Sequence, residues 1–297
     1  MLLQTNVAAQ IETLVTLAGT TDFQACRGLS SLKELKRGYR RFLASLGQRS
    51  IDAHCDEPIY AATEADAAQL KALFSNDSGL DDKLQSRVIT GERDPEWNEK
   101  RARIEGALYE ISLYSPAYAE IFRTVVTNIV ILPSTIARAG STSRAIGVIW
   151  ANPKLGYTMS DLMELLLHEF THQTMFLDEL RHGHYSYRVI TDRSTWAKSA
   201  ILNVQRPLDK VLHSVVVAAE VLLVRQQHIG QPATPRVHPP TDIMLRQLYE
   251  SVSSLADAVR RHPEALTPRA DEIVANVRHL IGRTIRPSAA APKRCTN

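Results

Sequence analysis

Apolar residues recur at every third or fourth position along most of the chain, which is the spacing of an amphipathic helix. Pro116 is the candidate break in the longest of these segments, because proline removes a backbone donor from a helix. Two β-branched runs follow at 128–133 and 145–150, separated by a turn-prone stretch at 139–143. The predicted helices cover residues 3–18, 29–46, 63–74, 96–125, 160–180, 207–228, 241–261 and 271–282.

This order of elements predicts an α+β fold that is predominantly helical, with a small sheet beside the helix at 160–180. We expect residues 1–126 to form a helical N-terminal part. Residues 127–284 are expected to form the part that binds a metal and carries the chemistry, packed with the first as one compact unit. The proline-rich stretch 232–240 predicts a linker, and the tail 285–297 is expected to be disordered.

Composition and charge exclude several classes of protein. A net charge of +3 over 297 residues, with scattered basic side chains, does not favour binding to nucleic acid. No apolar run is long enough to span a bilayer, and the first residues lack a secretory signal. Cys26, Cys55 and Cys295 are odd in number and lack the spacing of a metal finger, so reduced thiols in a cytoplasmic protein are expected.

The helix at 160–180 contains the motif His168-Glu169-Phe170-Thr171-His172. Two histidines four residues apart project from one face of a helix, so both imidazoles can reach one metal ion. Glu169, which lies between them in sequence, can act on a metal-bound water or brace the site. Glu164 falls on the same face and is a candidate to hold a ligand histidine by hydrogen bonding. The competing interpretation is a helix with two solvated or hydrogen-bonded histidines.

A second informative helix, at 207–228, is apolar over most of its circumference and is therefore expected to be buried. His213 interrupts its apolar surface, with Asp209 one turn earlier and Glu220 two turns later on the same face. A core histidine with a hydrogen-bond partner is the ordinary explanation of such a residue. Because the two-histidine site needs a further protein ligand, we favour His213 as that ligand, with Asp209 and Glu220 as supporting groups.

The loop after the motif helix contains His182 and His184. These residues are candidates to line the cleft, and polar loop histidines are the alternative that we favour.

One chemistry that fits the motif is zinc-dependent peptide hydrolysis, with Glu169 as the general base. The long metzincin pattern fails here, because Met175 stands where that pattern needs glycine and Asp178 where it needs histidine. A version with a glutamate ligand would use Glu220.

The second chemistry rests on a resemblance. The stretch Leu167–His172, followed by Arg206-Pro-Leu before His213 and an Ala/Val-rich helix, resembles the HExxH-containing peptide-modification proteins. These include iron(II)/α-ketoglutarate-dependent peptide β-hydroxylases of ribosomal peptide pathways. Trp196 also fits that pattern, whereas Ser214 stands where a glycine is expected. The resemblance covers about residues 145–228.

The resemblance implies that His168, His172 and His213 hold Fe(II), with positions left for the keto acid and O₂. The substrate would be an amino-acid residue, within a peptide or a peptide natural-product precursor. Glu169 would then hydrogen-bond near the metal instead of acting as a base. A third possibility is a metal-binding protein without catalysis that serves as a partner in a biosynthetic complex.

The distal carboxylate of α-ketoglutarate requires a cation with planar donors, a role that suits arginine. Arg206, beside the helix of His213, is the first candidate, and Arg188 and Arg193 are the second. The alternative for Arg206 is an ordinary surface residue at a helix start.

Overall fold

The computed structural model describes most of the chain. The described residues are 7–21, 31–47, 57–60, 64–74, 89–91 and 94–283. The predicted disordered tail and all three cysteines lie outside them.

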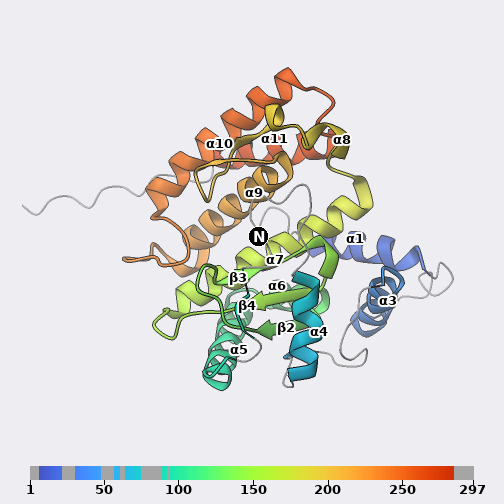
Figure 1. Ribbon diagram of the computed structural model, residues 1–297, viewed down its shortest axis with the longest axis vertical. Coiled ribbons are helices and arrows are strands. Elements are labelled where there is room, and N and C mark those ends of the chain that lie inside the picture. Colours follow the sequence, from blue (N-terminus) through green and yellow to red (C-terminus); the bar gives the residue numbers. More distant parts are fainter. Residues whose placement is uncertain are drawn as a thin grey trace, which may run out of the picture.

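The protein is mostly helical and has one small mixed sheet, as the sequence predicts (Figure 1). The predicted break at Pro116 is confirmed, because one helix ends at Tyr114 and the next begins at Pro116. The helices are α1 (Val7–Gly19), α3 (Leu32–Ser45), α4 (Glu64–Phe74), α5 (Trp97–Tyr114), α6 (Pro116–Val125), α7 (Met159–His182), α8 (Tyr187–Ile190), α9 (Leu208–Val224), α10 (Thr241–Arg261) and α11 (Pro268–Arg283).

The sheet has the strand order β1-β2-β4-β3, made by β1 (Ile59–Tyr60), β2 (Asn128–Ile131), β4 (Val148–Ala151) and β3 (Ala139–Gly140). β1, β2 and β4 are parallel, and β3 runs antiparallel to β4 at the edge. The two predicted strands are therefore confirmed. The predicted turn at 139–143 is wrong at its start, where Ala139 and Gly140 pair with β4.

The two faces of the sheet are buried against different helices. Ile129, Ile131 and Ile149 belong to the main core, whereas Val130 and Trp150 pack in a smaller cluster that includes residues of α4. Successive side chains of a strand point to opposite faces, so a strand covered on both sides needs a continuous apolar run. This requirement explains the unbroken β-branched sequence of β2.

The long helix α7 lies at the centre of the molecule and contacts α1, α5, α6, α9 and the edge strand β3 (Figure 1). Gln173 ties it to the sheet. The Gln173 side-chain oxygen accepts from the backbone N–H of Gly147 at 2.7 Å, and its amide donates to the carbonyl of Val148 at 2.9 Å. Because this buried side chain satisfies two backbone groups beside β4, it fixes the register of the helix against the sheet.

Helix α9 packs against α7 on one side and against α10 and α11 on the other. Every residue from Val211 to Val224 is buried, as its apolar sequence predicts. It continues into a π-helical turn, Arg225–Ile229. None of the helices in the described ranges is long and apolar enough to cross a membrane.

A short hairpin precedes α9 and was not predicted. Its strands are β5 (Ala197–Lys198) and β6 (Gln205–Arg206). Ser214, which stands where the family resemblance expects glycine, ties this hairpin to α9. Its hydroxyl accepts from the N–H of Ala200 at 3.0 Å and donates to the carbonyl of Val211 at 2.8 Å.

The main hydrophobic core runs from Leu14 in α1 to Ile281 in α11. Side chains of both predicted parts, 1–126 and 127–284, therefore share one apolar interior. The division into these parts stays a prediction.

Candidate functional site

The helix that carries the two motif histidines begins at a capping box. The Thr158 hydroxyl accepts from the N–H of Asp161, and the Asp161 carboxylate accepts from the N–H of Thr158. A threonine followed three residues later by an acidic residue is typical of a helix start, and the two reciprocal bonds satisfy N–H groups that a helix leaves without internal partners. The helix ends at His182, and the following Gly183 has a φ of 69°, a conformation that glycine adopts without strain.

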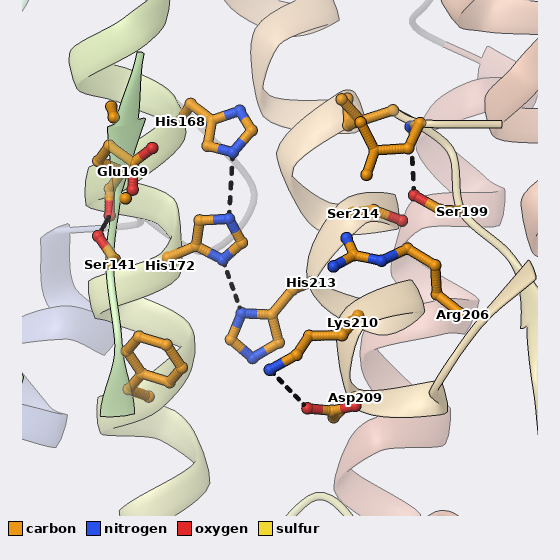
Figure 2. A pocket seen from close by; sticks show the side chains of 15 residues that line it. Ser141, His168, Glu169, His172, Ser199, Arg206, Asp209, Lys210, His213 and Ser214 are labelled. Atoms are coloured by element: carbon orange, nitrogen blue, oxygen red, sulfur yellow. Dashed lines mark hydrogen bonds and ion pairs between the residues drawn. The ribbon is translucent and has the colours of Figure 1, made fainter. Parts of the chain in front are cut away.

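Three histidines lie in a row between α7 and α9 (Figure 2). Nε2 of His168 lies 3.1 Å from Nε2 of His172. Nδ1 of His172 lies 2.8 Å from Nδ1 of His213, which comes from α9. The structure thus brings His213 next to the two motif histidines, although it stands 41 residues beyond His172 in the sequence.

All three imidazoles are held neutral at ordinary pH. Burial lowers the pKa of His168 to about 3. Burial also lowers the pKa of His172 and of His213 well below the usual value, and nearby cationic groups add to the effect. A neutral imidazole keeps a nitrogen lone pair, which is the form that binds a metal.

Glu169 is buried beside the histidine row, and its Oε2 atom has no hydrogen-bond partner among the described residues. Burial raises the pKa of this carboxyl to about 8, with a smaller opposing effect from Ser141. A buried carboxyl oxygen without a partner is costly, so such positions call for a functional explanation.

The row opens into a cavity of about 260 Å³. Its lining residues are Ala139, Gly140, Ser141, His168, Glu169, His172, Phe176, Ser199, Ile201, Leu202, Arg206, Asp209, Lys210, His213 and Ser214. They come from the edge strand β3, from α7, from the β5–β6 hairpin and from the first turns of α9. This size is just below the roughly 300–1,000 Å³ typical of small-molecule sites.

Two cationic side chains line one side of the cavity. The guanidinium of Arg206 points toward the histidine row, and Lys210 lies beside His213 (Figure 2). Both positive charges contribute to the lowered pKa of His172 and of His213. Asp209 also lines the cavity, with a carboxylate 3.2 Å from the Lys210 amine. The sequence prediction included Arg206 and Asp209 but missed Lys210.

Other candidates lie away from the cavity. Arg188 and Arg193 are exposed, and the guanidinium of Arg193 stacks on Trp196 at 5.3 Å. Glu220 is buried in α9 but does not line the cavity, and its charge acts on Tyr118. The structure therefore does not bring these three side chains to the histidine row.

The loop histidines do not line the cavity either. His182 is exposed, as the favoured prediction of polar loop residues expects. His184 differs from that prediction, because it is fully buried and its Nε2 lies 2.8 Å from the Asp178 carboxylate. A carboxylate within the core accounts for a histidine that the loop sequence alone would leave in solvent.

A further histidine meets the row from the segment predicted as a linker. His238 is buried, and its Nε2 lies 2.8 Å from Nδ1 of His168. Its Nδ1 lies 3.0 Å from the carboxylate of Glu164. The same carboxylate forms a bidentate ion pair with Arg225, in which Nε donates to Oε1 at 2.7 Å and Nη2 donates to Oε2 at 2.9 Å. Glu164 thus holds a motif histidine through an intermediate side chain. No spacing in the sequence connects His238 or Arg225 to the motif.

A metal ion fits part of this arrangement directly. The 3.1 Å between Nε2 of His168 and Nε2 of His172 is a separation that two metal–nitrogen bonds of about 2.1 Å can span. In the described part of the chain, no three histidine, cysteine or acidic side chains are already arranged around one point. His168 lies next to Nε2 of His172, whereas His213 lies next to Nδ1 of His172. For His213 to bind the same ion as the two motif histidines, the imidazole ring of His213 must rotate. Three neutral imidazoles beside a partnerless carboxyl oxygen are a suitable donor set for Fe(II) or Zn(II).

No protein-family model matches this chain, and a search of curated proteins finds no match either.

Proposed function

We propose that this protein is an iron(II)- and α-ketoglutarate-dependent oxygenase that hydroxylates an amino-acid residue, in a peptide or a peptide natural-product precursor. The observation that carries the proposal is the meeting of His168, His172 and His213 in a cavity that also contains Arg206. In this proposal the motif helix α7 is the metal helix, packed between the small sheet and the ligand-bearing helix α9.

The three histidines would hold the ion through neutral imidazole nitrogens. When bound, Fe(II) with α-ketoglutarate and O₂ supplies the oxidation, in which the keto acid becomes succinate and CO₂ and one oxygen atom enters a substrate C–H bond. Arg206 would bind the distal carboxylate of the keto acid, with Lys210 adding positive charge beside it. The apolar residues Ile201 and Leu202 at the hairpin would contact the substrate and keep water from the site.

The keto-acid role of Arg206 can be tested by substitution. Arg206→Leu should weaken α-ketoglutarate binding at least tenfold, because a charge-assisted pair is lost, while metal content stays unchanged. The assay is calorimetric titration of keto acid into metal-loaded protein without oxygen, together with succinate release when oxygen and candidate peptides are added. Arg193→Leu, on the protein surface, is the matched control. Equal keto-acid affinity in the wild type and Arg206→Leu would refute this role.

One observation favours a second chemistry, the zinc-dependent hydrolysis of a peptide. Glu169 lines the same cavity as both motif histidines. Its Oε2 atom has no hydrogen-bond partner among the described residues, so it is available to accept a proton from a water molecule, as a general base requires. Two features weigh against this alternative. Glu220, its candidate glutamate ligand, does not line the cavity, and the long metzincin pattern is absent from the motif helix.

The variant Glu169→Gln separates the two chemistries. A hydrolase needs the carboxylate to take a proton from the attacking water, so glutamine should remove nearly all turnover at full metal occupancy. In the proposed oxygenase Glu169 only hydrogen-bonds near the metal, and glutamine keeps its shape and an acceptor oxygen. We therefore expect measurable, reduced succinate release per bound metal. Peptide cleavage with Zn(II), abolished in Glu169→Gln and without keto-acid consumption, would establish the hydrolase instead.

A further inference from the structure

The proline-rich segment between α9 and α10 packs against α7 through specific polar contacts. The backbone N–H of Arg236 donates to the Asp161 carboxylate at 2.9 Å, beside the start of α7. The guanidinium of Arg225 donates to the carbonyl of Pro239 at 2.8 Å and to the hydroxyl of Thr241 at 3.2 Å. These contacts hold the chain on both sides of His238, so its imidazole has a fixed place beside the motif helix.

Three side chains form a buried hydrogen-bonded line that ends on a motif histidine. Glu164 Oε2 lies 3.0 Å from His238 Nδ1, and His238 Nε2 lies 2.8 Å from His168 Nδ1. The side chains of Glu164, His238 and Arg225 are at most 1% exposed. Water therefore does not compete for these bonds, and each polar atom must find its partner within the protein.

The charge on Glu164 determines which nitrogen donates and which accepts in the two hydrogen bonds that join Glu164, His238 and His168. Burial acts to raise the pKa of Glu164, but hydrogen bonds from His238 and Arg225 and the charge of Arg225 outweigh it and lower the pKa. The ionised carboxylate can only accept, so Nδ1 of His238 carries a hydrogen. With its hydrogen on Nδ1 facing Glu164, the His238 imidazole can offer the lone pair of Nε2, which accepts from Nδ1–H of His168 at 2.8 Å.

We propose that Glu164 and His238 act as a positioning pair that keeps the hydrogen of His168 on Nδ1, so that its Nε2 stays unprotonated and faces the cavity. The metal-binding consequence rests on the oxygenase proposed above, whereas the tautomer is a property of the metal-free protein. The segment at 232–240 is then part of the site. A ligand histidine is commonly oriented by a carboxylate or a carbonyl, and here a second imidazole transmits the carboxylate's effect.

The first test reads the tautomer directly. Two-bond ¹H–¹⁵N correlation spectra of the metal-free protein, assigned with His168→Gln and His238→Gln variants, show which nitrogen of His168 carries the hydrogen. We expect Nδ1–H for His168 and Nδ1–H for His238. A hydrogen on Nε2 of His168 in the wild type would overturn the proposal, whether or not any variant folds.

The second test measures metal affinity independently of turnover, by chelator competition with Co(II). His238→Ala should weaken Co(II) binding about 10–100-fold, the usual effect of losing a group that orients a ligand. His238→Gln should recover most of the affinity, because its amide oxygen can accept from His168. The matched control is His182→Ala, which changes an exposed histidine at the C-terminal end of α7, the helix of His168. It should not change the affinity for Co(II). Wild-type affinity in a folded His238→Ala protein would also overturn the proposal.

The two hypotheses can fail separately. If the wild type shows the expected tautomer but binds no Co(II), the pair positions His168 and the metal-dependent oxygenase is wrong. If the wild type consumes keto acid but His168 carries its hydrogen on Nε2, the oxygenase stands and the positioning pair is wrong.

Discussion

Arg269 of α11 anchors the far end of the motif helix, and its removal has a calculable effect on stability. Its guanidinium forms two bonds to the Asp178 carboxylate, at 2.9 Å from Nε and 2.7 Å from Nη2. Nε2 of His184 lies 2.8 Å from the same carboxylate. The Asp178 side chain is 6% exposed and that of Arg269 is 27% exposed, so the pair is neither fully buried nor a surface contact.

These exposures set the expected magnitude for Arg269→Met. Breaking a fully buried pair costs about 3–5 kcal/mol, and a surface pair contributes about 0–1 kcal/mol. An intermediate value of about 2 kcal/mol is expected, because Asp178 keeps His184 as a partner. Because a chain of 297 residues has an unfolding entropy of about 0.6 kcal/mol/K, that change lowers the midpoint of thermal unfolding by roughly 3 °C.

The effect depends on pH with a definite sign. Burial acts to raise the pKa of Asp178, but hydrogen bonds from His184 and Arg269 and the charge of Arg269 lower it well below its usual value. A carboxyl with a lowered folded-state pKa stabilises the fold above its unfolded pKa of about 3.9, and this stability is lost as pH falls toward the folded value. The difference between the wild type and Arg269→Met should therefore be full at pH 6 and shrink in acid, where Asp178 of the folded variant takes up a proton before Asp178 of the wild type does.

Urea unfolding at pH 6 and pH 3.5, followed by circular dichroism, measures both predictions. Arg278→Met, an exposed arginine on the same helix, is the matched control and should change stability by less than about 0.5 kcal/mol. If Arg269→Met and Arg278→Met have equal midpoints at pH 6, the anchoring role is refuted. A difference that grows on acidification would refute the assigned sign.

Two further substitutions test how the sheet is joined to the helices. Gln173→Leu should destabilise the protein by about 2–4 kcal/mol in urea unfolding, because the N–H of Gly147 and the carbonyl of Val148 both lose a partner; an effect below about 1 kcal/mol would contradict this role. Gly147→Ala should cost about 1–3 kcal/mol, because φ is +87° and a Cβ would lie 3.2 Å from the carbonyl oxygen of Val125 and 3.0 Å from Thr127 Oγ1. Unchanged stability in Gly147→Ala would show that the backbone relaxes there.

The helices could be predicted closely because their ends have local causes. The segment 241–261 coincides with α10, which begins after Pro240 and ends before the sequence His262-Pro263. The start of α7 follows from the capping residues Thr158 and Asp161. Such features act within one turn of a helix, so a single sequence contains them in full.

Elements whose stability comes from distant partners could not be predicted in this way. Ala139 and Gly140 have low strand propensity, and they form β3 because β4 offers an edge for pairing. The hairpin before α9 has strands of two residues each, too short for a periodic signal. In both cases tertiary contacts decide the local structure.

The residues of the candidate site also fall into two groups, those that local sequence predicts and those that only tertiary contacts bring to the site. His168 and His172 follow from spacing within one helix, and His213 follows from a polar residue in an otherwise apolar helix. His238 lies 70 residues from His168 in a segment without periodicity, so only the folded chain shows their contact. Arg188 and Arg193 were candidates through nearness in sequence, which carries no information about the cavity.

The polar side chains buried along α7 have partners that explain them, with one exception. Asp161 caps the helix, Glu164 pairs with Arg225 and His238, Gln173 joins the sheet, and Asp178 binds Arg269. Each of these contacts satisfies a polar group that would otherwise be buried without a partner. Glu169 keeps an oxygen without a partner among the described residues, in the wall of the cavity that the two motif histidines also line. Burial of a carboxyl oxygen without a compensating contact costs stability, and Glu169 is the side chain of α7 for which the described residues provide no such contact.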